Sequence, residues 1–172
     1  MRLRNVFLAA IIVFMAACTK DALDITFDAN YNVDIPVAVT GAKAEYDFAV
    51  SDTIDPTADS EVAKYLDRIK KWELNGLETK FTELTEDFKL INAKLSVESG
   101  DFLAEWTFEN VDVTEAYNMI LQNLNGQFDE INKILASKKS FIISFVGKTD
   151  KKDIAFKLGT LVKTKVTASP LD

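Results

Sequence analysis

Histidine is absent from the 172 residues of this chain, and cysteine occurs only once. Without histidine there is no Ser-His-Asp or Cys-His catalytic group and no imidazole ligand for a metal. One cysteine cannot form an internal disulfide, a CxxC pair or a zinc cluster. The six glycines and three prolines form no GxGxxG or GxSxG motif. We therefore expect a protein without cofactor or metal, and not an enzyme.

Positive charge is also scarce, with 20 Lys and Arg against 27 Asp and Glu and a net charge of −7. Nucleic-acid binding needs a basic surface, so we expect no nucleic-acid partner. Beyond the first four residues the only arginine is Arg68, which leaves almost no bidentate recognition of phosphate or carboxylate. A hydrophobic content of 48% is ordinary for a globular chain and too high for a disordered one.

The N-terminus has the three parts of a secretory signal. Arg2 and Arg4 supply positive charge, residues 6–15 form an unbroken apolar run, and two alanines follow. The run has ten residues, whereas a membrane-spanning helix needs about 20. The pattern predicts a cleaved signal peptide over residues 1–17 and no permanent transmembrane helix.

The only cysteine, Cys18, stands directly after this signal. Met15-Ala16-Ala17-Cys18 resembles the lipobox of bacterial lipoproteins, in which Leu more often takes the first position. The resemblance implies cleavage before Cys18 and acylation of Cys18 by a diacylglycerol and an N-terminal acyl chain, which anchor a protein stably in a bilayer. The alternative is an ordinary cleaved signal with a chance cysteine.

The residues after the cysteine bear on where the protein goes. In Gram-negative lipoproteins a residue other than Asp after the cysteine usually implies the outer membrane, and Thr19 fits that pattern. Lys20-Asp21 resembles the charged export tags of surface lipoproteins in Bacteroidota. We expect a lipid-anchored protein of the cell envelope, in the outer membrane, with the periplasmic or surface face left open. Residues 18–22 are then the lipidated tether and residues 23–172 a single domain.

Period-two alternation dominates the rest of the chain and predicts strands with one buried face. It covers residues 23–40, where we expect a hairpin or bend near residues 28–32 because a strand of that length is unusual. A second long alternation covers residues 154–167, with a bulge expected at Gly159. Further strands are predicted at residues 45–51, 77–81, 91–97 and 102–108, with a turn at 99–101, and at residues 141–146, covered on both faces.

Helical spacing occurs in two segments, residues 58–71 and residues 114–137. For the second, Asp112 and Glu115 form a plausible capping pair, and Gly126 marks a point where the helix bends or splits. We expect its apolar stripe to cover a sheet, with a partner-binding or lipid-contacting face as the alternative. The stripe comprises Tyr117, Ile120, Leu121, Leu124, Phe128, Ile131 and Leu135.

Mostly one-sided strands joined by short turns favour antiparallel pairing. The sequence predicts a mainly β fold, an antiparallel β-sandwich of seven to nine strands with two packed amphipathic helices. In outline this pattern resembles small Bacteroidota envelope lipoproteins of unknown function, and the resemblance supplies no active site.

Two polar patterns are candidates for a site. Asp28, Asn30 and Asn32 match the start of a calcium loop, D-x-N-x-N. Val33 stands where that loop needs Gly and Val39 where it needs a bidentate Glu, so a solvated strand face or an Asn-rich turn is favoured. Carboxylate pairs of the kind that glycosidases use are expected by chance among 27 acids, and nothing marks one pair as buried.

Aromatic and basic residues are interpreted as structural. Trp72 is ambiguous, because it lies between a predicted helix and a poorly patterned strand. Lysines at positions 138–139 and 148–152 are expected to be solvated turn charges, with membrane contact as the alternative. The strand aromatics are expected in the core rather than on a glycan-binding face: Tyr46, Phe48, Phe102, Trp106 and Phe108.

One modification site is suggested. Asp52-Thr53-Ile54 resembles the Asp-Ser/Thr-apolar pattern of O-glycosylation in Bacteroidota envelope proteins, which makes Thr53 a candidate. The pattern precedes Asp55-Pro56, which is expected to form an exposed turn.

These observations favour a membrane-anchored envelope lipoprotein that acts as a non-catalytic binding or structural module. Its contacts are the bilayer, through acylated Cys18, and an unknown protein or glycan partner. One alternative is a carrier or sensor of an apolar ligand held between the sheets and the helix predicted to include residues 117–135. A second alternative is a carboxylate-dependent enzyme acting on envelope carbohydrate.

Overall fold

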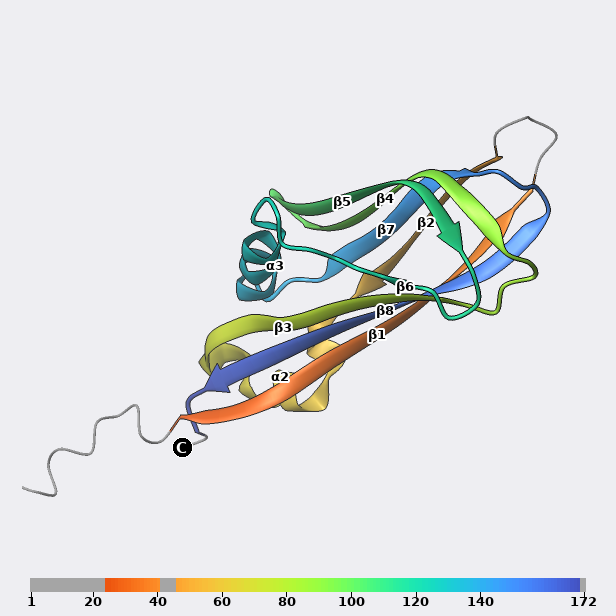
Figure 1. The fold of residues 1–172 in the computed structure, drawn as a ribbon. Helices are drawn as coiled ribbons and strands as arrows, with labels where there is room; N and C mark the ends of the chain where they lie inside the picture. Colours follow the sequence, from red (N-terminus) through yellow and green to blue (C-terminus); the bar gives the residue numbers. More distant parts are fainter. Residues whose placement is uncertain (1–23, 41–45, 171–172) are drawn as a thin grey trace, which may run out of the picture.

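The computed structural model describes residues 24–40 and 46–170 of the chain. In this part the predicted mainly β fold is confirmed: two four-stranded antiparallel sheets form a sandwich, accompanied by two α-helices (Figure 1). The strands are β1 (Ile25–Val39), β2 (Tyr46–Ile54), β3 (Ile69–Thr82), β4 (Phe88–Ser99), β5 (Phe102–Val113), β6 (Asn118–Met119), β7 (Phe141–Thr149) and β8 (Ile154–Ala168).

The first sheet has the order β1-β8-β3-β6, and the second has the order β2-β7-β4-β5. β1 pairs with β8 along its whole length, from Ile25 opposite Ala168 to Val39 opposite Ile154. The hairpin or bend predicted at residues 28–32 is therefore wrong, because β8 is as long as β1 and keeps it extended. The bulge predicted at Gly159 is also wrong, because the register runs through that position without a shift.

The core lies between the sheets and is rich in phenylalanine. Phe81 and Phe156 come from the first sheet, and Phe88 and Phe145 from the second. The ring centroids of Phe88 and Phe156 lie 4.9 Å apart, and those of Phe81 and Phe156 lie 5.4 Å apart. Such aromatic pairs add about 1 kcal/mol each to the apolar area that they bury. The contact between Phe88 and Phe156 joins the two sheets and helps to fix the distance between them.

The segment predicted as one helix over residues 114–137 is helical only in its last part. Its first half contains the short strand β6 and irregular backbone, and the helix α3 (Gln127–Ala136) begins only after Gly126. Gly126 has φ of 78°, a left-handed conformation that separates the irregular segment from the helix. The predicted capping pair is wrong as well, since Asp112 lies in β5 and Glu115 accepts hydrogen bonds from the backbone of residues 83 and 84.

The segment predicted as a helix over residues 58–71 contains a shorter one. The turns η2 (Pro56–Ala58) and η3 (Leu66–Arg68) flank α2 (Ser60–Tyr65), and β3 starts immediately afterwards. Asp59 caps α2 by accepting hydrogen bonds from the N–H groups of Glu61 and Val62. In the described residues no helix is long and apolar enough to cross a bilayer.

Two smaller predictions concern strands and turns. The turn at residues 99–101 is confirmed, because Ser99 pairs with Phe102 and Gly100 has φ of 60°, as the first central residue of a type II′ hairpin requires. Covering of β7 on both faces is wrong at Ile142, which is 37% exposed.

Candidate functional site

The open side of the sandwich, between β3 and β5, is crossed by residues 120–126, which we call the side segment (Figure 1). It leaves β6 at the edge of β3 and reaches the edge of β5 before α3 begins. Trp106 on β5 donates its indole N–H to the carbonyl of Gln122, at 2.8 Å. The side segment thus joins the two sheets where the sandwich has no strand.

The side segment exposes two large apolar side chains. Ile120 is 74% exposed and Leu124 is 75% exposed, far above the other large apolar side chains of the described residues. Leu121, between them, is buried. Three residues that were predicted to share one helical stripe therefore point to different sides of a segment that is not helical. Covering each exposed side chain is worth about 2 kcal/mol, so the pair favours a bound partner.

Two hollows flank the side segment. The first has a volume of about 490 Å³ and runs between the edge of β5, at Glu105 to Phe108, and Ile120, Gln122 and Leu124 of the side segment. We call it the β5 groove. The second, of about 360 Å³, lies between β3 and residues 118–121 and includes Thr79. Ile120 is part of the wall of both.

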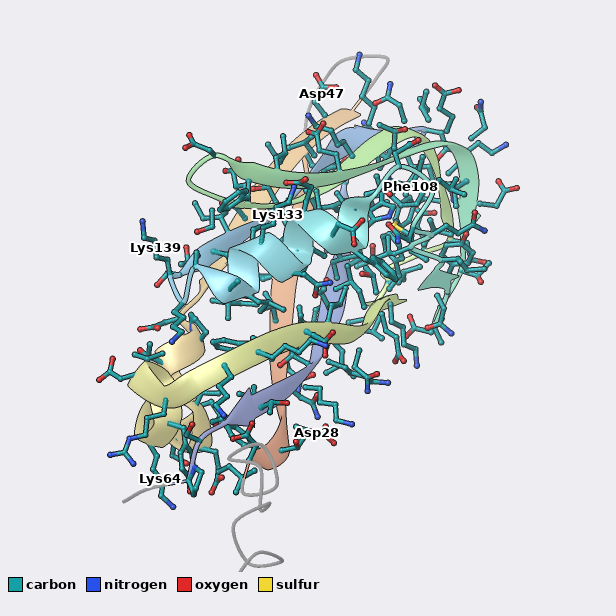
Figure 2. All side chains as sticks on the ribbon, turned by 90° about the vertical axis from the view of Figure 1, so that its left-hand side faces the viewer. Asp28, Asp47, Lys64, Phe108, Lys133 and Lys139 are labelled. Atoms are coloured by element: carbon teal, nitrogen blue, oxygen red, sulfur yellow. The ribbon has the colours of Figure 1, made fainter. Side chains whose placement is uncertain are left out.

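α3 fixes the end of the side segment. Ile131, Ile134 and Leu135 are buried, so the helical part of the apolar stripe belongs to the core, although α3 packs between β3 and β5 and does not cover the face of one sheet. Leu74 on β3 donates its N–H to Asn132 Oδ1 at 2.7 Å, and Gln127 donates from Nε2 to the carbonyl of Glu105 on β5 at 3.2 Å. Figure 2 shows α3 lying across the gap between the sheets, with Phe108 of the β5 groove beyond one end of it.

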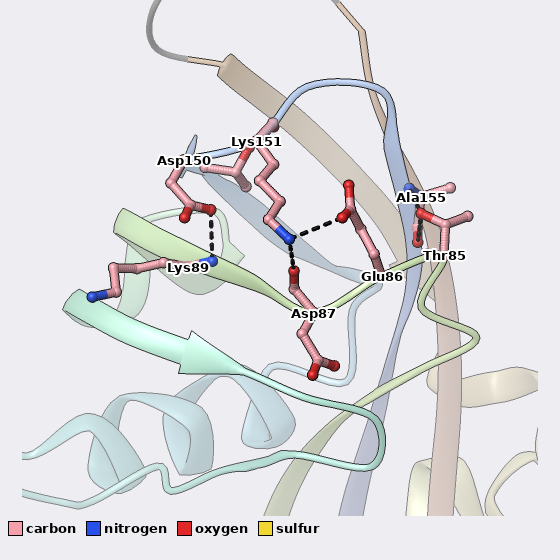
Figure 3. Close-up of polar contacts among 8 residues, drawn as sticks. Thr85, Glu86, Asp87, Lys89, Asp150, Lys151 and Ala155 are labelled. Carbon is pink, nitrogen blue, oxygen red and sulfur yellow. Dashed lines mark hydrogen bonds and ion pairs between the residues drawn. The ribbon is translucent and has the colours of Figure 1, made fainter.

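A cluster of polar side chains at one end of the sandwich has a structural role. Lys151 Nζ donates to Glu86 Oε2 at 2.9 Å and to the carbonyl of Asp87 at 2.6 Å (Figure 3). Asp150 accepts from the N–H of Lys89 at 2.8 Å. The hydrogen bond to Glu86 raises the pKa of Lys151. The cluster links the β3–β4 connection to the β7–β8 connection, so its charges hold these two connections together.

The predicted site residues are scattered. Cys18, the signal peptide and the tether lie outside the described residues. Thr53 is exposed on β2, and its N–H binds Asp52 Oδ1 at 2.7 Å. The turn after it is only partly as expected, because Asp55 is exposed but Pro56 is buried.

The calcium-like pattern lies on one straight strand. Asp28, Asn30 and Asn32 are exposed on β1, where alternate residues stand about 6.6 Å apart. The residues described here contain no group of three or more Asp, Glu or Cys side chains arranged to hold a metal ion. A solvated strand face is the observed arrangement.

The aromatic predictions hold in part. Phe48 and Trp106 are buried, whereas Phe102 and Phe108 are half-buried, and the side chain of Tyr46 lies outside the described part. Trp72 is buried in the core. The exposed Ile120 and Leu124 were missed as a site, because their spacing also fits an amphipathic helix.

No protein-family model matches the chain, and no curated protein matches its sequence. Among solved structures, a chain from Desmodium yellow mottle tymovirus is similar, with 11% identity and a TM-score of 0.27. That match covers 86% of this chain and 85% of the viral one. A likeness at this level carries no argument about function.

Proposed function

We propose that this protein is a lipid-anchored module of the cell envelope that binds a partner, without catalysis, through the side segment. The anchor is Cys18 of the lipobox, and the outer membrane is its location. The observation that supports the binding surface is the exposure of Ile120 and Leu124 at 74% and 75%. Apolar surface that is contiguous and rimmed by polar residues marks interaction sites, and Ile120 and Leu124 line the same groove.

The anchor restricts where the module sits. Six residues from Cys18 to residue 23 span at most about 20 Å, even when fully extended. β1 starts at the end of the sandwich that also carries α2 (Figure 1). Anchoring would hold that end near the bilayer, while the side segment, on a lateral face, stays accessible to a partner in the same compartment.

Two experiments in the native host test the two parts of this proposal. Cys18→Ala should move the protein from the membrane fraction to the soluble fraction, and continued membrane association would refute the anchor. A photo-crosslinking amino acid at position 120 should give a discrete adduct, whereas the same group at position 142, on the outer face of β7, should not. Equal labelling at both positions would refute the binding surface.

A second candidate is a carrier of an apolar ligand. It is favoured by the hollow between β3 and residues 118–121, whose wall includes apolar side chains such as the exposed Ile120. Native mass spectrometry of protein from its own host tests it. An added mass of a few hundred daltons that is lost on denaturation would support a carrier, and the bare protein mass would oppose it.

A further inference from the structure

The β5 groove runs along a strand edge on which the outward backbone groups of Thr107 are free. In an antiparallel ladder the N–H and C=O of one residue point to the same side, and the side alternates along the strand. The carbonyl of Glu105 accepts a hydrogen bond from Gln127, which lies outside the sheet. Glu105 therefore faces away from β4, and two residues further on Thr107 faces the same way.

The opposite edge of this sheet, at β2, shows independently which residues of β5 face outward. The N–H of Thr53 binds the side chain of Asp52, so Thr53 faces away from β7. Following the register from Thr53 through β7 and β4 places Glu105 and Thr107 on the outward side of β5. In the described part of the chain, no hydrogen bond outside the ladder engages the backbone of Thr107.

The side segment lines the opposite wall of this edge without pairing with it. Ile120 and Leu124 stand across the groove from Thr107, so a chain lying in the groove would find hydrogen-bonding groups on one wall and apolar side chains on the other. An extended peptide offers both features, because its backbone bonds to one side while alternate side chains pack on a surface. The one ionisable side chain that lines the groove, Glu105, is already paired with Lys94 at 2.7 Å, so the occupant is selected by its backbone and its apolar side chains rather than by charge.

We propose that an extended segment of a protein partner, with alternating apolar and polar residues, adds to the sheet at the free edge of β5. Its backbone pairs with Thr107, and its apolar side chains cover Ile120 and Leu124. This inference rests on the proposed function and names the kind of partner that the side segment takes. It also explains why α3 and the side segment leave this stretch of the β5 edge uncovered.

The test measures binding of the full chain to a synthetic peptide of three Lys-Val repeats. Its controls are a Lys-Ser peptide, which lacks apolar side chains, and a Lys-Val peptide methylated on all internal backbone nitrogens. We expect only the unmethylated Lys-Val peptide to bind and to slow hydrogen exchange of the Thr107 amide. Binding of the methylated peptide with equal affinity, or failure of the unmethylated peptide to bind at millimolar concentration, would overturn the proposal.

Two variants of matched chemistry locate the contact. Thr107→Pro removes an outward N–H, a change that an edge strand tolerates, and should weaken peptide binding at least tenfold. Ala49→Pro makes the same change at the outward edge of β2 and should leave binding within twofold. Leu124→Asp, which alters no backbone group, should also weaken binding at least tenfold. Equal effects of the two proline variants would refute strand addition at β5.

The outcomes separate this inference from the proposed function. If photo-crosslinking at position 120 succeeds while Thr107→Pro leaves that adduct unchanged, the binding surface stands and strand addition fails. Concentration-dependent dimerisation that Leu124→Asp abolishes would identify a second copy of this chain as the occupant and overturn the peptide. Binding of a glycan that leaves Thr107 exchange unchanged would overturn it as well.

Discussion

The indole N–H of Trp72 donates a hydrogen bond to the hydroxyl of Thr164, 2.9 Å away in the interior of the first sheet. The same hydroxyl donates to the carbonyl of Ala29 on β1, at 2.6 Å. These two hydrogen bonds link β3, β8 and β1. They give the indole N–H of Trp72, which is only 4% exposed, an acceptor. Thr164→Val should therefore cost about 1–3 kcal/mol of unfolding free energy, because the indole N–H loses its acceptor. Urea denaturation measures the loss, and Thr164→Ser, which keeps a hydroxyl, should recover most of it.

Thr160, on the same strand, should respond in the opposite direction. Its hydroxyl is buried and has no partner in the described residues. Thr160→Val keeps the shape and removes a group whose burial without a hydrogen bond is unfavourable. We expect the unfolding free energy to rise by about 1 kcal/mol. A loss of stability in the same urea experiment would show that the hydroxyl has a partner in solution.

Two glycines differ in how much space surrounds them. A Cβ at Gly147 would lie 2.6 Å from the carbonyl oxygen of Asn92 and 2.9 Å from the ring of Phe48. At Gly76 the nearest atom would lie at 3.6 Å, in the flexible side chain of Lys163. Gly147→Ala should cost about 1–3 kcal/mol through overpacking, whereas Gly76→Ala should be near neutral. Equal melting temperatures for the two variants would contradict the close approach at Gly147.

The burial pattern of the side segment leads to a prediction that distinguishes the observed irregular segment from the helix predicted from the sequence. Ile120→Ser changes an exposed side chain and should alter stability by no more than about 0.5 kcal/mol. Leu121→Ser removes a buried side chain and should cost about 2–3 kcal/mol. Thermal unfolding of the two variants compares them directly. A larger cost at position 120 than at 121 would reverse the burial described for this segment.

The hydrogen bonds of Asp55, at the start of η2, predict that stability depends on pH. The hydroxyl and N–H of Thr57 both donate to Asp55 Oδ1, at 2.7 and 2.9 Å, and lower the pKa of this carboxyl. Because the folded pKa lies below the unfolded one, the stabilisation is present above the unfolded pKa and is lost as pH falls through the folded pKa. An NMR titration should show the lowered pKa, and Thr57→Val, which keeps only the backbone donor, should raise it. An unchanged pKa in that variant would exclude the hydroxyl as the main cause.

The sequence revealed much of the sandwich where period-two alternation is unbroken. β1 and β8 have that pattern along their length, β4 has it from Ala93 to Val97, and the hairpin at Gly100 also has a local turn signal. The first half of β3 was missed because its register shifts twice, between Ile69 and Lys71 and between Leu74 and Gly76. Each shift moves the following side chains to the other face, so the alternation that reveals a strand is lost.

The candidate site was harder to predict, for a different reason. Ile120 and Leu124 are spaced four residues apart, as on one face of a helix, and only tertiary contacts keep this segment from forming one. Those contacts are the pairing of Met119 with Thr79 and the bond from Trp106 to the carbonyl of Gln122, both remote in sequence. The free backbone edge at Thr107 depends on strand order, which local pattern does not determine.

The placement of β8 has a consequence for how this chain reaches its native state. The last strand made lies between β1, the first strand made, and β3. One sheet therefore cannot close until β8 has left the ribosome, and pairings between such distant segments form slowly. Export by the proposed signal peptide would, with that delay, keep half of the sandwich open during translocation. A chain cut before Ile154 would lose the common partner of β1 and β3 and remain unfolded on that side.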